Sequence, residues 1–194
     1  MTFANSNIIL ICLQLIAAAN GLIGQHFVGK RKIAGCFMWI CADLLYIVIN
    51  GLAGLYPIVV LHLFYLVQNA YMAWEWRKPV EDRPVAADLN GFVHGVVVLS
   101  LLVCVLSFVW LPSSQALFVV ESVAALAGIA GTFLASHMRV SSHVAWLLSL
   151  SLLAFVYGVS DMPVMLIQQI GYLVLCWRGM REWLRSSKQG AVRA

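Results

Sequence analysis

Charged residues are scarce in this chain. Only 10% of its 194 residues are Asp, Glu, Lys or Arg, and 62% are apolar, whereas about a quarter of a soluble domain is charged. A soluble domain of this length still exposes much of its area to water and cannot bury so large an apolar fraction. The shortage of charge and the mean hydropathy of +0.91 therefore exclude a soluble protein and predict an integral membrane protein.

Motifs that mark enzymes and metal sites are also missing. The sequence holds no GxxxxGK[ST] loop, no HExxH and no GxSxG. Its five cysteines lie in or beside apolar runs, without a CxxC or a histidine at metal spacing, which favours simple packing. Four histidines lie near predicted helix ends, where we expect solvation: His26, His94, His137 and His143. The sequence thus predicts no catalytic residue, no metal site and no cofactor.

Seven long apolar runs follow one another. A helix needs about 20 mostly apolar residues to cross the hydrocarbon layer, and seven segments reach or approach that length: 7–28, 34–54, 57–76, 91–111, 115–136, 143–159 and 162–180. No basic residue precedes the first run, as one would in a cleaved secretory signal, so we expect this helix to be retained. The sequence predicts an all-α membrane protein with seven transmembrane helices.

The basic residues indicate the orientation of these helices, because cytoplasmic loops are enriched in Lys and Arg. With the N-terminus outside and the C-terminus in the cytoplasm, every Lys and Arg falls on an inner loop or an inner helix end: positions 30, 31, 32, 77, 78, 83, 139, 178, 181, 185, 188 and 193. The net charge of +4 then reflects topology, and we expect no nucleic-acid partner.

An internal repeat appears at an offset of 107 residues. Residues 8–78 align without a gap on residues 115–185, with identities that include Trp39/Trp146, Tyr65/Tyr172 and Trp76/Trp183. Each unit has three helices and one helix lies between them, so the two units must be parallel. We expect a first repeat at 1–78, an inner loop and linker helix at 79–114, a second repeat at 115–185 and a cytoplasmic tail at 186–194.

Polar residues at membrane depth form stripes, because spacings of three and four residues share one helix face. The second predicted helix carries Trp39, Asp43, Tyr46 and Asn50, the third His62, Tyr65, Gln68 and Asn69, and the seventh Gln168, Gln169, Tyr172 and Cys176. Such groups usually face the bundle interior or a water-filled cavity. We expect a central cavity lined by Asp43, His62, Tyr65, Asn69, Gln168, Gln169 and Tyr172, with at least one of Trp39 and Trp146.

A second interpretation of these stripes remains open, since polar side chains also bond to one another and hold membrane helices together without any cavity. Asp43 and Glu121 have no Lys or Arg at their depth, so each is either protonated or lines a polar cavity. The small residues that follow Gln14 and Glu121 favour close helix packing: Ala17, Gly21, Ala124 and Gly128.

The helix plan and several short motifs resemble a known family. Three helices, a linker helix and three more helices form the plan of SWEET-type sugar facilitators and of PnuC-type vitamin transporters. The motifs resemble the PnuC type: Leu55-Tyr56, Phe64, Asn69-Ala70-Tyr71 and Trp76, then Trp146, Gly179 and Trp183. Two positions depart from that pattern, since Leu150 stands where the family has an Asn four residues after its Trp, and Met72 stands where it has a Gly.

The resemblance implies a carrier of the bacterial inner membrane. It implies facilitated diffusion, by alternating access, of a small neutral vitamin precursor such as nicotinamide riboside. Trp39 and Trp146 are then expected to stack on the solute ring, and its polar groups to bond to Asp43, Asn69, Gln168 and Gln169. A SWEET-like carrier of a small sugar and a non-transporting seven-helix membrane protein are the alternatives. The expected partners are the solute and the lipid bilayer, and a homo-oligomer is left open.

Overall fold

Seven helices form in the described part of the chain, as the sequence predicts. The computed structural model describes residues 3–52, 56–77, 85–89, 91–159 and 163–193. The helices are α1 (Phe3–Gly29), α2 (Ala34–Leu52), α3 (Tyr56–Glu75), α4 (Gly91–Trp110), α5 (Ser113–Ser136), α6 (Ser141–Val159) and α7 (Pro163–Arg193). No strand occurs among these described residues. Most of the bounds lie within a few residues of the predicted segments, but α7 continues to Arg193 because no proline interrupts this stretch.

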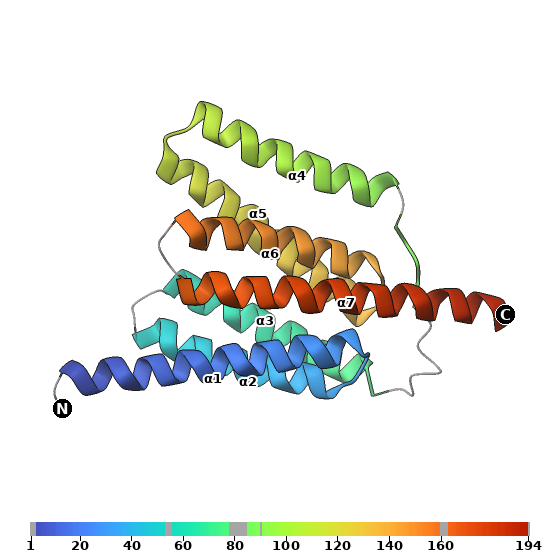
Figure 1. Ribbon diagram of the computed structural model, residues 1–194, viewed down its shortest axis with the longest axis horizontal. Coiled ribbons are helices and arrows are strands. Elements are labelled where there is room, and N and C mark those ends of the chain that lie inside the picture. The colour runs from blue at the N-terminus through green and yellow to red at the C-terminus, as the bar shows by residue number, and fades with distance from the viewer. Residues whose placement is uncertain (1–2, 53–55, 78–84, 90, 160–162, 194) are drawn as a thin grey trace.

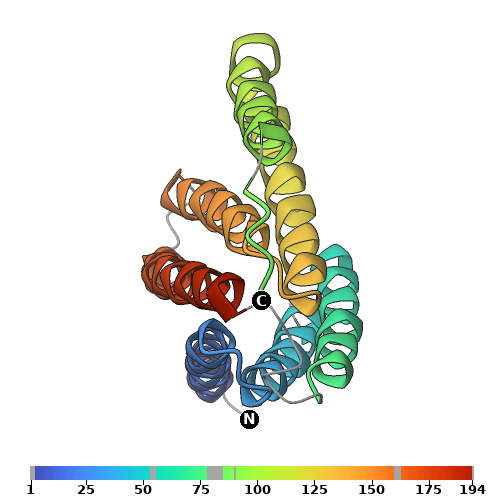
Figure 2. The same cartoon turned by 90° about the vertical axis from the view of Figure 1, so that its right-hand side faces the viewer.

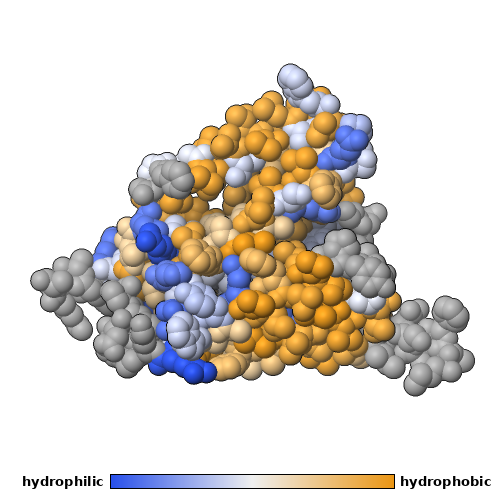
Figure 3. All heavy atoms as spheres, turned by 180° about the vertical axis from the view of Figure 1, so that it is seen from behind, coloured by the Kyte–Doolittle hydropathy of each residue, from blue (hydrophilic) through white to orange (hydrophobic). Residues whose placement is uncertain are grey.

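Length and composition alone qualify four described stretches as membrane-spanning: Ile11–Gly29, Val93–Trp110, Ser113–Ser136 and Ser141–Val159. The polar stripe of α3 and the charged end of α7 lower the mean hydropathy of those two helices. Hydrophobic side chains cover most of the face shown in Figure 3, and many large ones are exposed, including Leu99, Val109 and Phe118. A surface of this kind fits a lipid environment.

Two helices end in the same way at positions 107 residues apart. After α1, Arg31 takes a left-handed φ of 57° and the Lys32 N–H donates to the Phe27 carbonyl at 2.9 Å. After α5, Met138 takes a φ of 55° and the Arg139 N–H donates to the Leu134 carbonyl at 3.1 Å. Such bonds satisfy the free carbonyls of a helix end and reverse the chain sharply.

Six of the helices form a ring. Packing runs from α1 to α2 to α3, and from α5 to α6 to α7, and the ring closes through contacts of α1 with α7 and of α3 with α5. Figures 1 and 2 show α4 outside this ring, against α5 and α6. Each helix of α1–α3 has the same neighbours as its counterpart in α5–α7, because the α1–α7 contact is the equivalent of the α5–α3 contact. This arrangement is the one expected of two parallel units.

One end of the ring is closed by apolar side chains. We call this end the basic end, because described Lys and Arg residues gather there. They lie in the α1–α2 turn (Lys30, Arg31 and Lys32), in the α5–α6 turn (Arg139) and near the end of α7 (Arg181 and Arg185). The buried cluster there includes Val28, Cys36, Met72, Trp76, Met180 and Trp183. The Trp183 indole N–H donates to the Gly29 carbonyl at 2.9 Å, and the rings of Trp76 and Trp183 lie 6.1 Å apart. The cluster therefore joins the two halves of the ring at the basic end.

A loop segment also fastens this end. The Ala86 N–H donates to the Met138 carbonyl and the Val140 N–H donates to the Ala86 carbonyl, both at 3.0 Å. Asp88 accepts from the Ser141 backbone N–H at 2.9 Å and from its hydroxyl at 2.6 Å. Because Ser141 is the first residue of α6, Asp88 caps that helix from a distant point in the chain.

Candidate functional site

A buried carboxylate lies at the centre of the polar stripes. Asp43 on α2 is only 6% exposed, and both of its oxygens have partners on α3. Its Oδ1 lies 3.0 Å from His62 Nδ1, and its Oδ2 accepts from Asn69 Nδ2 at 2.8 Å. The polar stripes of α2 and α3 therefore face each other. Asp43 of the α2 stripe contacts two members of the α3 stripe, His62 and Asn69.

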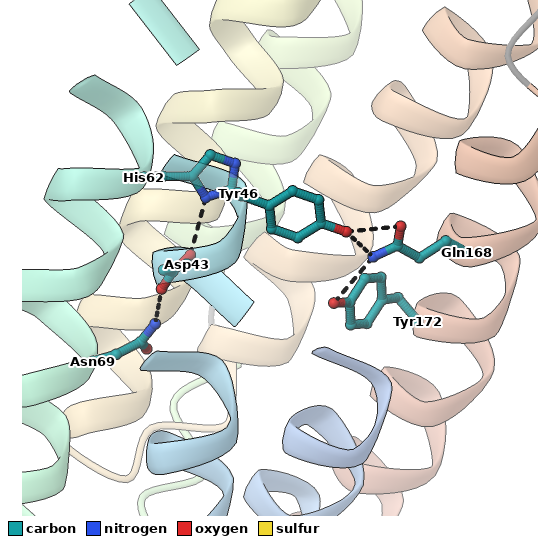
Figure 4. A network of polar contacts seen from close by, with 6 residues as sticks. All are labelled: Asp43, Tyr46, His62, Asn69, Gln168 and Tyr172. Atoms are coloured by element: carbon teal, nitrogen blue, oxygen red, sulfur yellow. Dashed lines mark hydrogen bonds and ion pairs between the residues drawn. The ribbon is translucent and has the colours of Figure 1, made fainter. Parts of the chain in front are cut away.

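A second set of contacts joins α2 to α7. The Tyr46 hydroxyl bonds to Gln168, with distances of 3.1 Å to Oε1 and 2.9 Å to Nε2. The same Nε2 lies 3.4 Å from the Tyr172 hydroxyl. The Tyr46 ring stacks on His62, with centroids 4.9 Å apart and planes 19° apart, so the two sets of contacts form one network across the ring (Figure 4).

Two tyrosines reach across the ring to glycines of the opposite half. A Cβ added to Gly21 of α1 would collide with the Tyr172 hydroxyl of α7. A Cβ added to Gly128 of α5 would lie 2.6 Å from the Tyr65 hydroxyl of α3. Only a residue without a side chain leaves room for either hydroxyl, which gives these two glycines a steric role. Gly21 and Gly128 are equivalent positions of the repeat, and so are Tyr65 and Tyr172. In each contact, the glycine of one half therefore meets the tyrosine of the other half.

The two predicted tryptophans contact each other in the apolar cluster of the basic end, of which Trp146 is a member and against which Trp39 packs. Trp39 of α2 and Trp146 of α6 have centroids 5.4 Å apart in an edge-to-face contact. Trp39 donates its indole N–H to the Gly21 carbonyl at 3.1 Å, and Trp146 donates to the Thr132 hydroxyl at 3.4 Å. Trp39 lies one helical turn from Asp43 on the side of the basic end.

Three buried amide oxygens have no hydrogen-bond partner among the described residues. They are Gln68 Oε1, Asn69 Oδ1 and Gln169 Oε1. The other end of Gln68 donates to the Ile129 carbonyl at 3.2 Å, and Asn69 and Gln169 are 4% and 7% exposed. A buried acceptor without a donor is costly. Each of these oxygens is therefore an acceptor that a donor group of a bound molecule or of water can use.

One cavity in the described part of the chain lies away from the network. It has a volume of about 270 Å³ and opens at the basic end, lined by Gly29, Lys30, Arg31, Glu182, Trp183 and Ser186. None of the nine predicted binding residues lines it. The structure instead shows several of them bonded to one another: Asp43, His62 and Asn69, and Gln168 with Tyr172.

Other expectations from the sequence have mixed outcomes. The side chain of Asn50 lies outside the described residues, and Glu121 is exposed on α5. Tyr46 belongs to a predicted stripe but is missing from the predicted binding set, although it links α2 to Gln168. Tyr46 lies three residues after Asp43, on the same face of α2, and this spacing is the sequence signal that could have added it to the binding set.

The expectation of a solvated His143 is wrong. Its side chain is fully buried, 4.7 Å from the Trp183 ring and 5.4 Å from the Trp146 ring between centroids. Gly29 of α1 and Gly179 of α7 approach each other closely, and Gly179 also lies beside the His143 ring. The position of His143 near a helix end does not predict this contact between distant helices.

The described residues contain no group of three or more His, Cys, Asp or Glu side chains placed to hold a metal ion. The network itself provides hydrogen-bonding groups, one carboxylate and aromatic faces. These are the elements of a binding site for an organic solute.

Comparison with known proteins gives two matches. The model of a family described as nicotinamide mononucleotide transporters matches residues 11–185. A solved structure described as the vitamin B3 transporter PnuC superposes with a TM-score of 0.67 at 19% sequence identity, covering 91% of this chain and 82% of that one. No curated protein sequence matches the chain.

Proposed function

Because the chain belongs to the nicotinamide mononucleotide transporter family, we propose that it carries a small vitamin B3 precursor such as nicotinamide riboside across a membrane by facilitated diffusion. The observation that carries the proposal is the set of unpartnered buried amide oxygens on Gln68, Asn69 and Gln169. Asn69 belongs to the network that spans the ring, through its bond to Asp43. A nicotinamide carboxamide and ribose hydroxyls are hydrogen-bond donors of the kind these oxygens lack.

The proposed site takes its polar groups from both halves of the ring. Asp43 and Asn69 come from the first half, and Gln168 and Gln169 from the second. Trp39 and Trp146 are proposed to pack against the solute ring on the side of the basic end, where their edge-to-face contact lies next to the network. His62, Tyr65 and Tyr172 complete the lining.

Charge favours the nucleoside over its phosphorylated form. A phosphate group is usually held by Arg or Lys, and the described Lys and Arg residues lie at the basic end. Arg178 is the nearest in sequence to Gln168 and Gln169 on α7, yet it lies about 14 Å farther along the helix axis at 1.5 Å per residue. A phosphate at the network would instead meet the carboxylate of Asp43.

We propose that the two halves of the ring provide alternating access to the site. The apolar cluster with Trp76 and Trp183 closes the basic end in this structure. Release there requires the α1–α7 seam, where Gly29 and Gly179 touch, to open. Rocking of one parallel unit against the other is the motion that transporters with such repeats use. We assign residues 1–78 and 115–185 to these units and 79–114 to the linker.

A counterflow assay tests this function. Purified protein is reconstituted into liposomes loaded with unlabelled nicotinamide riboside, and labelled nicotinamide riboside is added outside without any ion gradient. A carrier gives transient accumulation of label, because exchange on a shared site is faster than net flux. Unlabelled nicotinamide riboside, glucose and nicotinamide mononucleotide serve as competitors in the outer solution.

The result separates the three candidate functions. Competition by unlabelled riboside alone supports the proposal. Counterflow of glucose in place of the riboside would favour the small-sugar carrier, and no counterflow of either would favour the non-transporting protein.

A further inference from the structure

The carboxylate of Asp43 accepts hydrogen bonds at both oxygens. Asn69 Nδ2 is always a donor, and His62 Nδ1 donates in the tautomer that carries its proton there. Two donors on one buried carboxyl group stabilise its ionised form. In the described part of the chain, its ion-pair partner is His62, and Lys and Arg stand one or more helical turns beyond the network. Asp43 thus brings one carboxylate to the network, and no Lys or Arg lies beside it among the described residues.

The second half of the ring has no equivalent charge. At the 107-residue offset, Leu150 takes the place of Asp43, Gln169 that of His62 and Cys176 that of Asn69. The second unit packs its helices in the same order without a carboxylate at this position, so this packing does not require one. A charge in one unit alone fits a solute that is itself charged on one side.

Aromatic faces surround this charge. The Tyr46 ring stacks on His62 at 4.9 Å, and Tyr65 meets the same imidazole edge-on at 6.1 Å between centroids. Trp39 lies on the same face of α2 as Asp43, one turn away. A carboxylate among aromatic rings is the chemistry that binds a delocalised organic cation, since ring faces and the anion both attract it.

We propose that Asp43 is the counter-charge that makes this site select a solute with a positive charge on an aromatic ring over its neutral counterpart. The proposal rests on the proposed function and deepens it, because the ring nitrogen of a nicotinamide nucleoside is quaternary and its ring is therefore a cation. It replaces the expectation of a neutral solute. The neutral amides of Gln168 and Gln169 face the uncharged side of such a molecule.

The test compares two ligands that differ mainly in charge. Nicotinamide riboside has a cationic ring, and its dihydro form, reduced by one hydride, has a neutral ring of similar size. Their dissociation constants are measured on wild-type protein in lipid nanodiscs by displacement of labelled nicotinamide riboside. We expect the wild type to bind the cation roughly tenfold more tightly or better, since a buried charge pair is only weakly screened.

Three variants test whether the preference for the cationic ligand depends on the charge of Asp43. Asp43→Asn keeps the size of the side chain and removes its charge, so we expect the two ligands to bind it with similar affinity. Asp43→Glu keeps the charge and should keep the preference. Glu75→Gln removes a carboxylate from α3, the helix of His62 and Asn69, but outside the network, and should bind as the wild type does.

Each outcome decides the matter. Equal affinity of the wild type for the two ligands, or a preference that survives in Asp43→Asn, overturns the role of Asp43 and leaves the transport function standing. Binding of neither ligand by the wild type overturns the transport function and this inference with it. If Asp43→Asn does not fold, the wild type and Asp43→Glu still decide, because loss of preference in the charged variant also contradicts the proposal.

Discussion

The Asn69 side chain has one amide atom that is hydrogen-bonded within the protein and one buried amide atom that is not. Its Nδ2 donates to Asp43, while its buried Oδ1 has no partner in the described part of the chain. Asn69→Ala should weaken solute binding by about 1–3 kcal/mol, roughly fivefold to 150-fold in Kd, with the protein still folded. Uptake into liposomes and the elution profile of the purified variant measure both effects.

Val67→Ala is the matched control for this variant, because Val67 lies on the same helix and is 68% exposed toward the lipid. It should transport as the wild type does. Wild-type uptake by both Asn69→Ala and Gln169→Ala would show that the network is not the solute site.

At the scale of elements, the α1–α7 seam depends on two glycines. A Cβ added to Gly179 would lie 2.9 Å from the Gly29 Cα and 2.9 Å from His143 Nε2, so the backbone of one helix must move. Gly179→Ala should therefore lower the free energy of unfolding by about 1–3 kcal/mol. Thermal unfolding in detergent, followed by tryptophan fluorescence, measures the change.

Gly95→Ala provides the comparison for that substitution. Nothing lies within 4 Å of a Cβ at Gly95, which is exposed on α4. Alanine there should raise stability by about 0.5–1 kcal/mol, because glycine is a poor helix residue. Equal effects of the two substitutions would contradict the close packing of α1 against α7.

The cap of α6 by Asp88 should depend on pH. Partial burial raises the pKa of the Asp88 carboxyl, but the bonds from the Ser141 hydroxyl and backbone, its own backbone N–H and Arg139 together lower it below its ordinary value. Stability from this carboxylate is therefore fully present above the ordinary carboxyl pKa of about 3.9 and is lost as the pH falls through the lower, folded value.

Asp88→Asn isolates this contribution. At neutral pH the variant should be less stable than the wild type by about 0.3–1 kcal/mol, because Asn still caps the helix but lacks the negative charge that the helix N-terminus favours. The difference should shrink toward zero as the pH is lowered below 4, because the wild-type carboxyl is then protonated. A difference in unfolding temperature that stays constant down to pH 3 would rule out an ionised cap.

At the scale of the whole molecule, the basic end should face the cytoplasm, because Lys and Arg are retained there. Alkaline phosphatase fused after Ala194 should then be inactive, since that enzyme needs the disulfides that form outside the cytoplasm. A fusion after Pro112, between α4 and α5, should be active. Activity in the reverse pattern would invert the proposed topology.

The sequence by itself determined the helices and the faces they present. Apolar runs of membrane length leave the backbone no alternative to helix in lipid, so the seven predicted segments appear in the structure. The spacing of Asp43 and Tyr46, and of His62 and Asn69, likewise placed each pair on one face before any contact was known. These features are local, because they depend only on residues within a few turns.

Only the tertiary structure decided which faces meet. The bonds of Asp43 to His62 and Asn69, and of Tyr46 to Gln168 across 122 residues, depend on how α2, α3 and α7 approach one another. The burial of His143 follows from the contact of Gly29 with Gly179, two positions 150 residues apart. Helix spacing in lipid is set by steric fit between distant surfaces, and the periodicity of a single helix holds no information about its partner.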